Sequence, residues 1–494
     1  MDPMSVLFLF ALTLLFLWER SNFWKSNSQK FPPGPRPLPL IGNLHLLDLQ
    51  RPYRTLFKLS KQYGPIFSIQ LGSSKAVVLV GYKTMKEALV NQAHPFAARP
   101  KLPMLEDVFH GHGILFSNGE KWKMTRRFSL TTLRDYGMGR KTIEDRIVEE
   151  GQFLIQKFES FKGKPFESTI IMNGATSNII LTILFGMRFE YEDPTFIRLL
   201  NLVNENIRLL GSAQLLLYNT FPALGFLSGD RKTVLKNRDE LFAFLEATYT
   251  ERLKELDEND QRSFLDVYLF QQQKDKNKNQ SNIFSDNEHL KTLLGDLIIA
   301  GTETTSATLR WGILLMMKYP EIQKKVHEEI TKVIGSAQPR MEHRTKLPYT
   351  DAVIHEVQRF GNILPLNLAH STNTDVTLGD YFIPKGTYVI QLLYSVLYDE
   401  SEWEKPFKFY PEHFLDSEGK FVKRDAFLPF SAGRRACAGE TLAKMEVFLF
   451  FVSLMQRFTF QPAPGMSKED LDLTPAIGFT ISPVPFRFCA LPRS

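Results

Sequence analysis

The chain has 494 residues, 43% of them hydrophobic and 12% aromatic, so it can bury a large core, and its net charge is only +6. Its two cysteines, Cys437 and Cys489, exclude a disulfide framework and favour a reducing compartment for the body of the protein. The sequence has neither zinc-ligand spacing nor a basic stripe interleaved with aromatic residues, so nothing in it supports nucleic-acid binding.

The N-terminal segment is the first predicted element. Residues 4–18 (MSVLFLFALTLLFLW) carry no charge and basic residues follow them, which predicts an uncleaved membrane anchor helix over residues 1–20. The alternative is a buried core helix or a cleaved signal, because the apolar run is shorter than the roughly 20 residues of a full span. The basic and proline-rich residues 21–43 are expected to form a stiff linker.

The body of the chain, residues 44–494, is expected to be one domain that is mainly α-helical with small β-sheets. Residues 63–81 alternate and are rich in β-branched residues, which predicts a hairpin. A mostly helical stretch follows, with a polar loop predicted at 271–282 and an amphipathic helix at 319–335. Short strands and turns then precede a last long helix at about 438–457.

One of the two cysteines stands in an unusual setting, FLPFSAGRRACAGETLAKMEVF. A thiolate that binds a metal must be ionised, shielded and hydrogen-bonded. Gly433 permits a tight turn, Gly439 permits a close backbone approach after Cys437, and the helix that begins there favours a thiolate through its dipole. Phe430 can cover the sulfur and Arg435 can pair with a carboxylate. We therefore expect the loop to present one thiolate to a flat, anionic metal cofactor.

This loop resembles the F-x-x-G-x-R-x-C-x-G haem-ligand loop of the cytochrome P450 monooxygenases at every fixed position. The segments AGTETT, EVQR, PEHF and WKMTR resemble further motifs of that family, and FSNGEKWKMTRRFSL and PYTDAVIHEVQRF are similar to its microsomal, xenobiotic-metabolising group, family 2. The resemblance covers nearly the whole chain and implies the family's mostly helical fold with small sheets. The alternative, an inert buried cysteine, is the interpretation that we keep for Cys489.

The resemblance also implies roles for single residues around haem b. Cys437 would be the axial ligand of the iron, Thr304 would hydrogen-bond the iron-bound oxygen, and Glu303 would help to relay protons. By itself, however, a threonine in a helix usually bonds its own turn. Gly301 is expected to permit a local helix bulge and, with Ala300, to leave room for O2 and substrate. The other haem contacts are expected to be Arg99, Trp122, Arg126, Ala300, His370, Phe430, Arg435 and Gly439.

Two further sets of residues follow from the same resemblance. Glu356 and Arg359 would form a structural ion pair, joined by the PEHF element, in which His413 stands where the family often has arginine. A pair at this spacing is also common on exposed helix surfaces. The substrate pocket is expected to be lined by Leu102, Leu115, Phe116, Ala300, Thr304, Leu364, Leu368, Ile477 and Phe479.

The implied activity is that of an unspecific monooxygenase, which inserts one atom of O2 into a lipophilic small molecule such as a fatty acid, a steroid or a xenobiotic. Electrons would come from NADPH indirectly, through NADPH-cytochrome P450 reductase, since the chain has no G-x-G-x-x-G loop after a strand. Cytochrome b5 is a second expected partner. The protein is expected in the endoplasmic reticulum membrane, with its catalytic domain on the cytoplasmic side. The reductase is expected to dock on Lys123, Arg127, Arg134, Arg140, Arg434 and Lys444.

Alternatives to this activity remain open. A haem-thiolate isomerase of lipid peroxides would need neither O2 nor a reductase, and members of that type tend to lose the helix threonine that this chain keeps as Thr304. A non-enzymatic haem-binding protein would not need the pair of Glu303 and Thr304. For the basic residues, the alternative to a docking surface is a solvated face.

Overall fold

The structure, a computed structural model, describes residues 30–136, 141–257, 260–277 and 283–493, together with residues 2, 4, 5, 10 and 13. The expected anchor helix and the first part of the expected linker therefore lie outside the described residues, apart from those five. In the part of the chain that is described, every helix is too short or too polar to cross a bilayer. The chain forms two compact units, Met1–Pro100 with Leu366–Ser395, and Lys101–Pro365 with Val396–Ser494.

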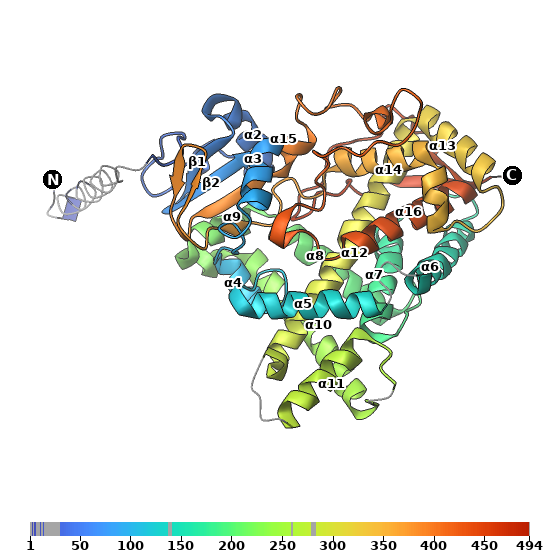
Figure 1. Ribbon diagram of the computed structural model, residues 1–494, viewed down its shortest axis with the longest axis horizontal. Helices are drawn as coiled ribbons and strands as arrows, with labels where there is room; N and C mark the ends of the chain where they lie inside the picture. The colour runs from blue at the N-terminus through green and yellow to red at the C-terminus, as the bar shows by residue number, and fades with distance from the viewer. Residues whose placement is uncertain are drawn as a thin grey trace. The chain divides into compact units, whose positions relative to one another are not determined.

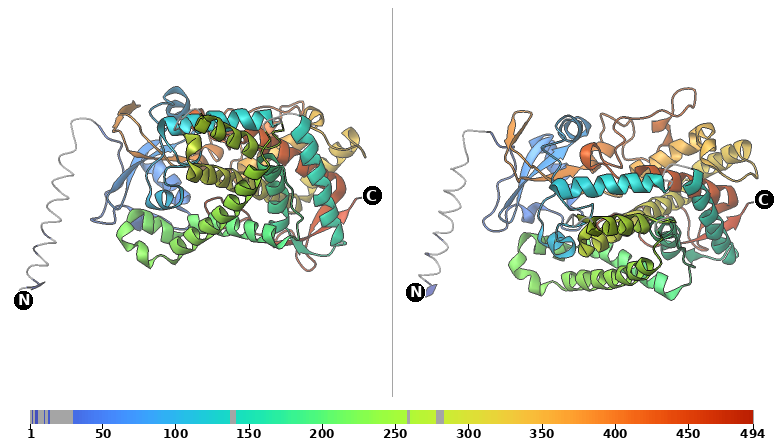
Figure 2. Two further views of the ribbon diagram at one scale, coloured as in Figure 1. Left: turned by 90° about the horizontal axis from the view of Figure 1, so that it is seen from below. Right: turned by 60° about the horizontal axis from the view of Figure 1, so that its bottom comes forward.

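The first unit is built on a four-stranded sheet in the order β1-β2-β7-β4. β1 (Ile66–Leu71) and β2 (Ser74–Val80) form the antiparallel hairpin that the alternating pattern predicts. β2 pairs in parallel with β7 (Tyr388–Leu392), which pairs antiparallel with β4 (His370–Ser371). Strands from the two ends of the unit's sequence thus lie side by side, blue and orange in Figures 1 and 2. The unit also contains α2 (Pro52–Tyr63), α3 (Tyr82–Lys86), β5 (Val376–Leu378) and β6 (Tyr381–Ile383).

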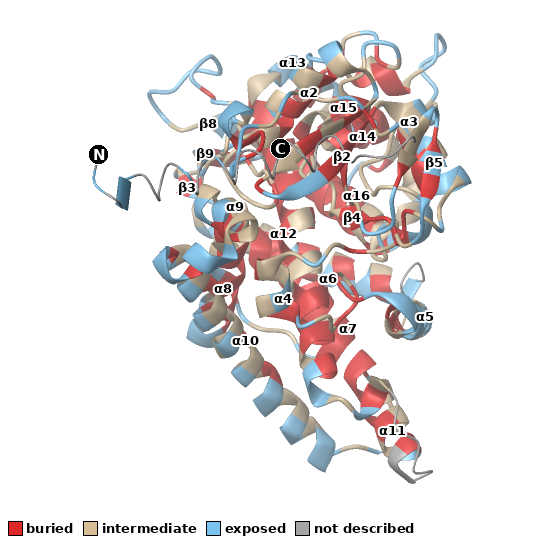
Figure 3. Ribbon diagram, turned by 90° about the vertical axis from the view of Figure 1, so that its left-hand side faces the viewer, coloured by how far each residue is buried: buried red, intermediate tan, exposed pale blue. Residues whose placement is uncertain are grey.

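The second unit is helical and is organised around α12 (Asn287–Lys318). This helix is long and mostly apolar, and it packs against α7 (Thr169–Phe185) and α16 (Glu440–Arg457). Figure 3 shows α12 and α7 largely buried, as expected of helices that are apolar on most faces. The unit also contains α4 (Pro103–Phe109), α5 (Gly119–Asp135), α6 (Lys141–Ser160), α8 (Pro194–Leu210), α9 (Ala213–Thr220), α10 (Gly229–Lys254), α11 (Phe264–Asn277), α13 (Pro320–Val333) and α14 (Pro348–Gly361).

A small sheet closes the second unit, in the strand order β3-β9-β8, with β3 (Phe166–Glu167), β8 (Phe458–Pro462) and β9 (Arg487–Pro492). The short helix α15 (Leu393–Leu397) lies where the chain passes from one unit to the other. The expected fold class, mainly helical with small sheets, is confirmed. The expected domain boundaries stay a prediction.

One predicted element is wrong in part. The polar stretch 271–282 is expected to be a loop, but α11 continues to Asn277 before the chain leaves the described residues. Glutamine and lysine are good helix formers, so a polar run can extend a helix. Tertiary structure also favours it, because the buried Gln272 donates to the carbonyl oxygen of Phe284 over 2.7 Å. The amphipathic helix is confirmed as α13, and it ends just before Gly335, which has φ +61°.

Candidate functional site

Cys437 lies between a short 3-10 turn, Gly433–Arg435, and the start of α16. Its backbone N–H donates to the carbonyl oxygen of Phe430 over 3.0 Å, which closes the loop. Gly433 has φ +75°, as the predicted tight turn requires. A Cβ on Gly439 would meet no described protein atom within 4 Å, so the close approach expected there is not to any described part of the chain. Cys437 is exposed, whereas Cys489 is buried in β9.

Several groups act on the Cys437 thiol in opposite directions. The residue is exposed as a whole, but protein surrounds the sulfur closely enough for burial to raise its pKa, and the carboxylate of Glu440 adds to that. The backbone N–H groups of Gly439 and Glu440 and the guanidinium of Arg126 lower the pKa. The N-terminus of α16 and the guanidinium of Arg126 are therefore the features of the site that stabilise a thiolate.

An indole and two guanidinium groups gather beside the cysteine loop. Trp122 and Arg126 lie one turn apart on α5, and Arg126 Nη2 donates to the carbonyl oxygen of Ala436 over 2.7 Å. The guanidinium of Arg435 stacks 3.8 Å above the Trp122 ring, and its Nη2 donates to the carbonyl oxygen of Ser117 over 2.7 Å. The Trp122 Nε1 is buried and has no hydrogen-bond partner among the described residues. These groups are suited to bind the carboxylates of an anionic ligand.

The middle of α12 is a continuous helix. Thr304 Oγ1 donates to the carbonyl oxygen of Ala300 over 2.8 Å, so this hydroxyl bonds its own turn and keeps its acceptor capacity. The bulge expected at Gly301 is not found. A Cβ there would lie 3.2 Å from Ile180 Cγ1 of α7, so this glycine allows the two helices to pack closely. The room for ligand that we expected at Gly301 is therefore taken by α7.

Glu303 points into a buried polar network between α12 and α7. Asn173 Nδ2 donates to Glu303 Oε2 over 3.0 Å, and Arg310 Nη1 lies 3.8 Å from Glu303 Oε1. Ser306 Oγ donates to Asn173 Oδ1 in the same network. Burial raises the pKa of Glu303, while Arg310 and Asn173 lower it. The structure thus directs this carboxylate toward α7.

A pocket lies between α12, α14, α16 and the cysteine loop. It brings together Thr304 and Leu364, two of the expected pocket residues, with Phe430 of the loop. The sequence missed most of the lining, although Thr305 and Thr308 follow Thr304 at spacings that keep them near one helix face. The other missed lining residues are Gln358, Asn362, Ile363, Leu397, Pro429, Ala443 and Val447.

The remaining expected pocket residues of the second unit do not line this pocket. The backbone N–H of Leu115 donates to Asp296 Oδ2 over 3.0 Å. Phe116 packs against Phe109 in a tilted arrangement, with ring centres 4.8 Å apart. The others lie at the N-terminus of α4 (Leu102), one turn before Thr304 (Ala300), and in the segment before β9 (Ile477 and Phe479). Their contacts with a substrate stay a prediction.

Three expected site residues, Arg99, Leu368 and His370, belong to the first unit. Arg99 Nη1 donates to the carbonyl oxygens of Leu368 and Ala369, each over 2.9 Å. His370 is buried in β4, which follows directly. The structure therefore brings Arg99 next to the segment that carries His370, and their contacts with haem stay predictions.

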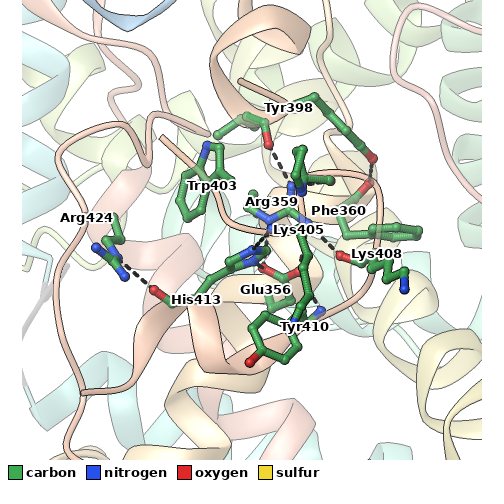
Figure 4. Close-up of polar contacts among 12 residues, drawn as sticks. Glu356, Arg359, Phe360, Tyr398, Trp403, Lys405, Lys408, Tyr410, His413 and Arg424 are labelled. Atoms are coloured by element: carbon green, nitrogen blue, oxygen red, sulfur yellow. Dashed lines mark hydrogen bonds and ion pairs between the residues drawn. The ribbon is translucent and has the colours of Figure 1, made fainter. Parts of the chain in front are cut away.

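Glu356 and Arg359 form a fully buried ion pair on α14, which Figure 4 shows, so they are not the surface pair that their spacing alone would allow. Arg359 donates from Nε to Glu356 Oε2 and from Nη2 to Glu356 Oε1, each over 2.7 Å. Its Nη1 also donates to the carbonyl oxygens of Leu397 and Pro406. The arginine thus joins α14 to the segment that leads toward the cysteine loop.

The expected docking residues are mostly at the surface. Lys123 pairs with Glu120 over 2.5 Å, and Lys444, which is half-buried, pairs with Glu440 over 2.6 Å. Arg140 lies outside the described residues. The other three, Arg127, Arg134 and Arg434, are exposed.

Comparisons with known proteins bear on the family of the whole chain. Residues 32–490 match the family model described as cytochrome P450. The chain is 52% identical over 484 residues to cytochrome P450 2K4 of Oncorhynchus mykiss, covering 98% of this chain and 96% of that protein. It is 50% identical to cytochrome P450 2K6 of Danio rerio, covering 92% and 90% of the two chains. It is 46% identical to cytochrome P450 2C16 of Oryctolagus cuniculus over the full length of both.

Proposed function

The chain belongs to the cytochrome P450 family, and on that premise we propose that the thiolate of Cys437 is the axial ligand of its haem iron. As a family 2 relative it is a haem-thiolate monooxygenase of lipophilic small molecules, with haem b as cofactor and with electrons from NADPH that arrive through a reductase. Thiolate-ligated haem supplies the oxygen-activating chemistry when it is bound.

The residues around Cys437 fit haem b in their donor chemistry. The exposed thiol at a helix N-terminus suits the iron, and Phe430 lines the adjoining pocket. The buried Trp122 Nε1, which has no described partner, together with Arg126 and Arg435, suits the propionates. The proposal rests on this observation: a thiol that can bind iron lies beside a cluster of groups that can bind carboxylates.

Within this site Thr304 is one of three threonines that line the pocket, and its hydroxyl can accept a hydrogen bond there. Arg126 and Arg435 would hold the carboxylates of the ring, and both are already fixed by carbonyl acceptors, so they would lose little side-chain freedom on binding. The buried pair of Glu356 and Arg359 holds the segment that leads to the cysteine loop.

The place of action is the endoplasmic reticulum membrane, with the catalytic body on the cytoplasmic side. This rests on the apolar N-terminal sequence with basic residues after it, and on the similarity to family 2 members. The partners are NADPH-cytochrome P450 reductase, received on the basic residues around Lys123 and Arg127, and cytochrome b5.

The axial ligand is tested by the absorption spectrum of the reduced, CO-bound protein. Cys437→His should lose the band of thiolate-ligated haem, whereas Cys489→Ser should keep it. The opposite pattern would overturn the assignment. The reaction is tested by NADPH consumption and product formation with and without reductase and O2. Turnover of a hydroperoxide without either of them would favour the isomerase instead.

A further inference from the structure

One loop of the second unit, residues 475–483, carries two of the expected pocket residues, Ile477 and Phe479. It has no helix or strand of its own and comes shortly before β9. An antiparallel bridge joins its first residue to its last, so the two ends of the loop lie side by side. Gly478, near the tip, stands between the two expected pocket residues. The position of this loop therefore decides where both side chains lie.

Two side chains of α12 hold the C-terminal end of the loop. Arg310 Nη2 donates to the carbonyl oxygen of Pro483 over 3.0 Å. The next residue, Trp311, donates from Nε1 to the carbonyl oxygen of Ile481 over 3.2 Å. Both donor residues are almost fully buried, with 3% and 2% exposure. Because a hydrogen bond from a charged donor is stronger than a neutral one, and more so away from water, Arg310 is the main anchor of this end.

The charge of Arg310 is balanced inside the protein. Its Nη1 lies 3.8 Å from Oε1 of Glu303, which is two turns earlier on the same helix and is also buried. A buried guanidinium without such a partner would be costly to keep away from water. Glu303 is not among the residues that line the pocket, and it serves here as the counter-ion of the side chain that holds the loop.

Backbone contacts join the loop to two further segments. The N–H of Ile481 donates to the carbonyl oxygen of Ile363 over 2.8 Å, and Ile363 lines the pocket. The N–H of Phe479 donates to the carbonyl oxygen of Ile207 in α8 over 2.9 Å. The loop therefore extends from a residue in the wall of the pocket to the C-terminal part of α8.

The tip of the loop packs closely on the end of α8. A Cβ on Gly211, which follows the last residue of α8, would lie 2.1 Å from the carbonyl carbon of Gly478. Gly211 has φ −92° and ψ 5°, a conformation that residues with side chains also adopt in turns. The close approach of Gly478, and not backbone strain, is therefore what excludes a side chain at Gly211. Ile477 and Phe479 flank Gly478, so this contact helps to set the position of both.

We propose that Arg310 is a positioning residue that holds the loop against α12 and thereby fixes Ile477 and Phe479 at the substrate. The proposal rests on the proposed monooxygenase function and on the substrate contacts expected of these two residues. Arg310 is not among the residues that line the pocket, so it acts through the loop. A loop that is already fixed loses little freedom when a ligand binds. Its anchors should therefore matter most for ligands that are large enough to touch it.

The first experiment measures hydrogen exchange of the backbone amides of residues 475–483 in the full-length haem protein. Arg310→Gln and Trp311→Phe should each speed exchange of the loop, because each removes a bond that holds its C-terminal end. Arg310→Lys, which keeps the buried charge but loses the planar fork, replaces Arg310→Gln if that variant does not fold. Gln272→Leu is the matched control, since it breaks a bond of the same kind, from a buried side chain to the carbonyl oxygen of Phe284. Unchanged exchange of the loop in the Arg310 variant would overturn the proposal.

The second experiment measures how tightly the haem protein binds two imidazoles, from the shift of the haem absorption band. Imidazole itself is small, whereas bifonazole is an imidazole that carries a large apolar aryl group. Arg310→Gln and Trp311→Phe should each weaken the binding of bifonazole about fivefold, because two side chains must then be ordered when it binds. The affinity for imidazole should stay the same. A loss of folded protein alone would reduce both shifts without changing the ratio of the two dissociation constants.

Gly211→Ala tests the tip of the loop by a different route. The added methyl group should displace Gly478 and weaken the binding of bifonazole relative to imidazole. Gly229→Ala is the matched control, since its Cβ would meet nothing within 4 Å, and it should bind both ligands as the wild type does. A ratio of dissociation constants that Arg310→Gln leaves unchanged would overturn the proposal, even if the loop exchanges faster. If the wild-type protein shows no shift with either imidazole, the proposed function fails, whereas hydrogen exchange still decides whether Arg310 fixes the loop.

Discussion

His413 Nδ1 lies 3.1 Å from Glu356 Oε2, and the backbone N–H of Lys405 donates to His413 Nε2 over 3.1 Å (Figure 4). Because Nε2 accepts a hydrogen bond, the proton of the neutral ring is on Nδ1, which donates it to Glu356. The histidine that stands where the family often has arginine thus acts as a third donor to Glu356 without adding a second positive charge. The pair of Glu356 and Arg359 stays neutral as a unit.

We expect His413→Leu to destabilise the protein. The substitution removes a donor from a fully buried carboxylate and leaves the Lys405 N–H without its acceptor, which costs about 1–3 kcal/mol of the free energy of unfolding for such groups. His413→Gln, which can both donate and accept, should recover part of this. Urea unfolding of the haem-bound protein measures it. Equal stability of the leucine variant and the wild type would contradict the role given to His413.

The loop before α5 offers a matched pair of glycines. Gly111 has φ +66° and Gly113 has φ +72°, so alanine is strained at both. A Cβ on Gly111 meets nothing within 4 Å, whereas one on Gly113 would lie 2.2 Å from Asp296 Oδ2. We expect Gly113→Ala to lower the melting temperature more than Gly111→Ala does. A similar fall in melting temperature in the two variants would show that backbone strain, and not the contact with Asp296, causes the loss of stability.

Asp296 predicts a dependence of stability on pH. Burial raises its pKa from 3.8 to about 7, while the backbone N–H groups of Leu115 and Ile114 lower it. A raised folded-state pKa means that the folded protein holds a proton which the unfolded chain releases. This contribution is complete below about pH 4 and is lost as pH rises through about 7.

Asp296→Asn should therefore gain stability relative to the wild type as pH rises from about 4 to about 7, by about 1.4 kcal/mol for each pH unit at most, and the difference should level off at higher pH. Denaturant unfolding at several pH values measures the difference between the two proteins. Asn retains an oxygen that accepts from Ile114, so the loop is kept. A difference that does not change with pH would show that Asp296 is ionised in the folded protein.

The expected docking surface is tested by charge reversal. Lys123→Glu with Arg127→Glu should slow turnover driven by the reductase, most strongly at low salt, because complementary charges mainly speed association. Turnover supported by added peroxide should be spared. Lys324→Glu, on the exposed side of α13, is the control for a general change in charge. Equal loss in the two assays would mean that Lys123 and Arg127 support the fold or the haem.

The local sequence was enough to determine the elements and the chemistry of the cysteine loop. Gly433 marks the turn, and the apolar period after Gly439 marks α16, because both signals act within a few residues. The hairpin of β1 and β2 and the start of α13 at Pro320 are local in the same way. The family resemblance then assigned roles to individual site residues, and these roles stay predictions.

Only the tertiary structure decided which side chains meet. Glu303 and Thr304 are neighbours in sequence, yet Glu303 bonds Asn173 of α7 while Thr304 lines the pocket. Thr305 lines the same pocket, and Gln358 and Asn362 reach it from α14 and its C-terminal end. Helix period fixes only the angle between side chains on one helix. Which face of α12 packs on α7 and which on α16 depends on the shapes of three buried surfaces at once, and no local pattern in the sequence carries that information.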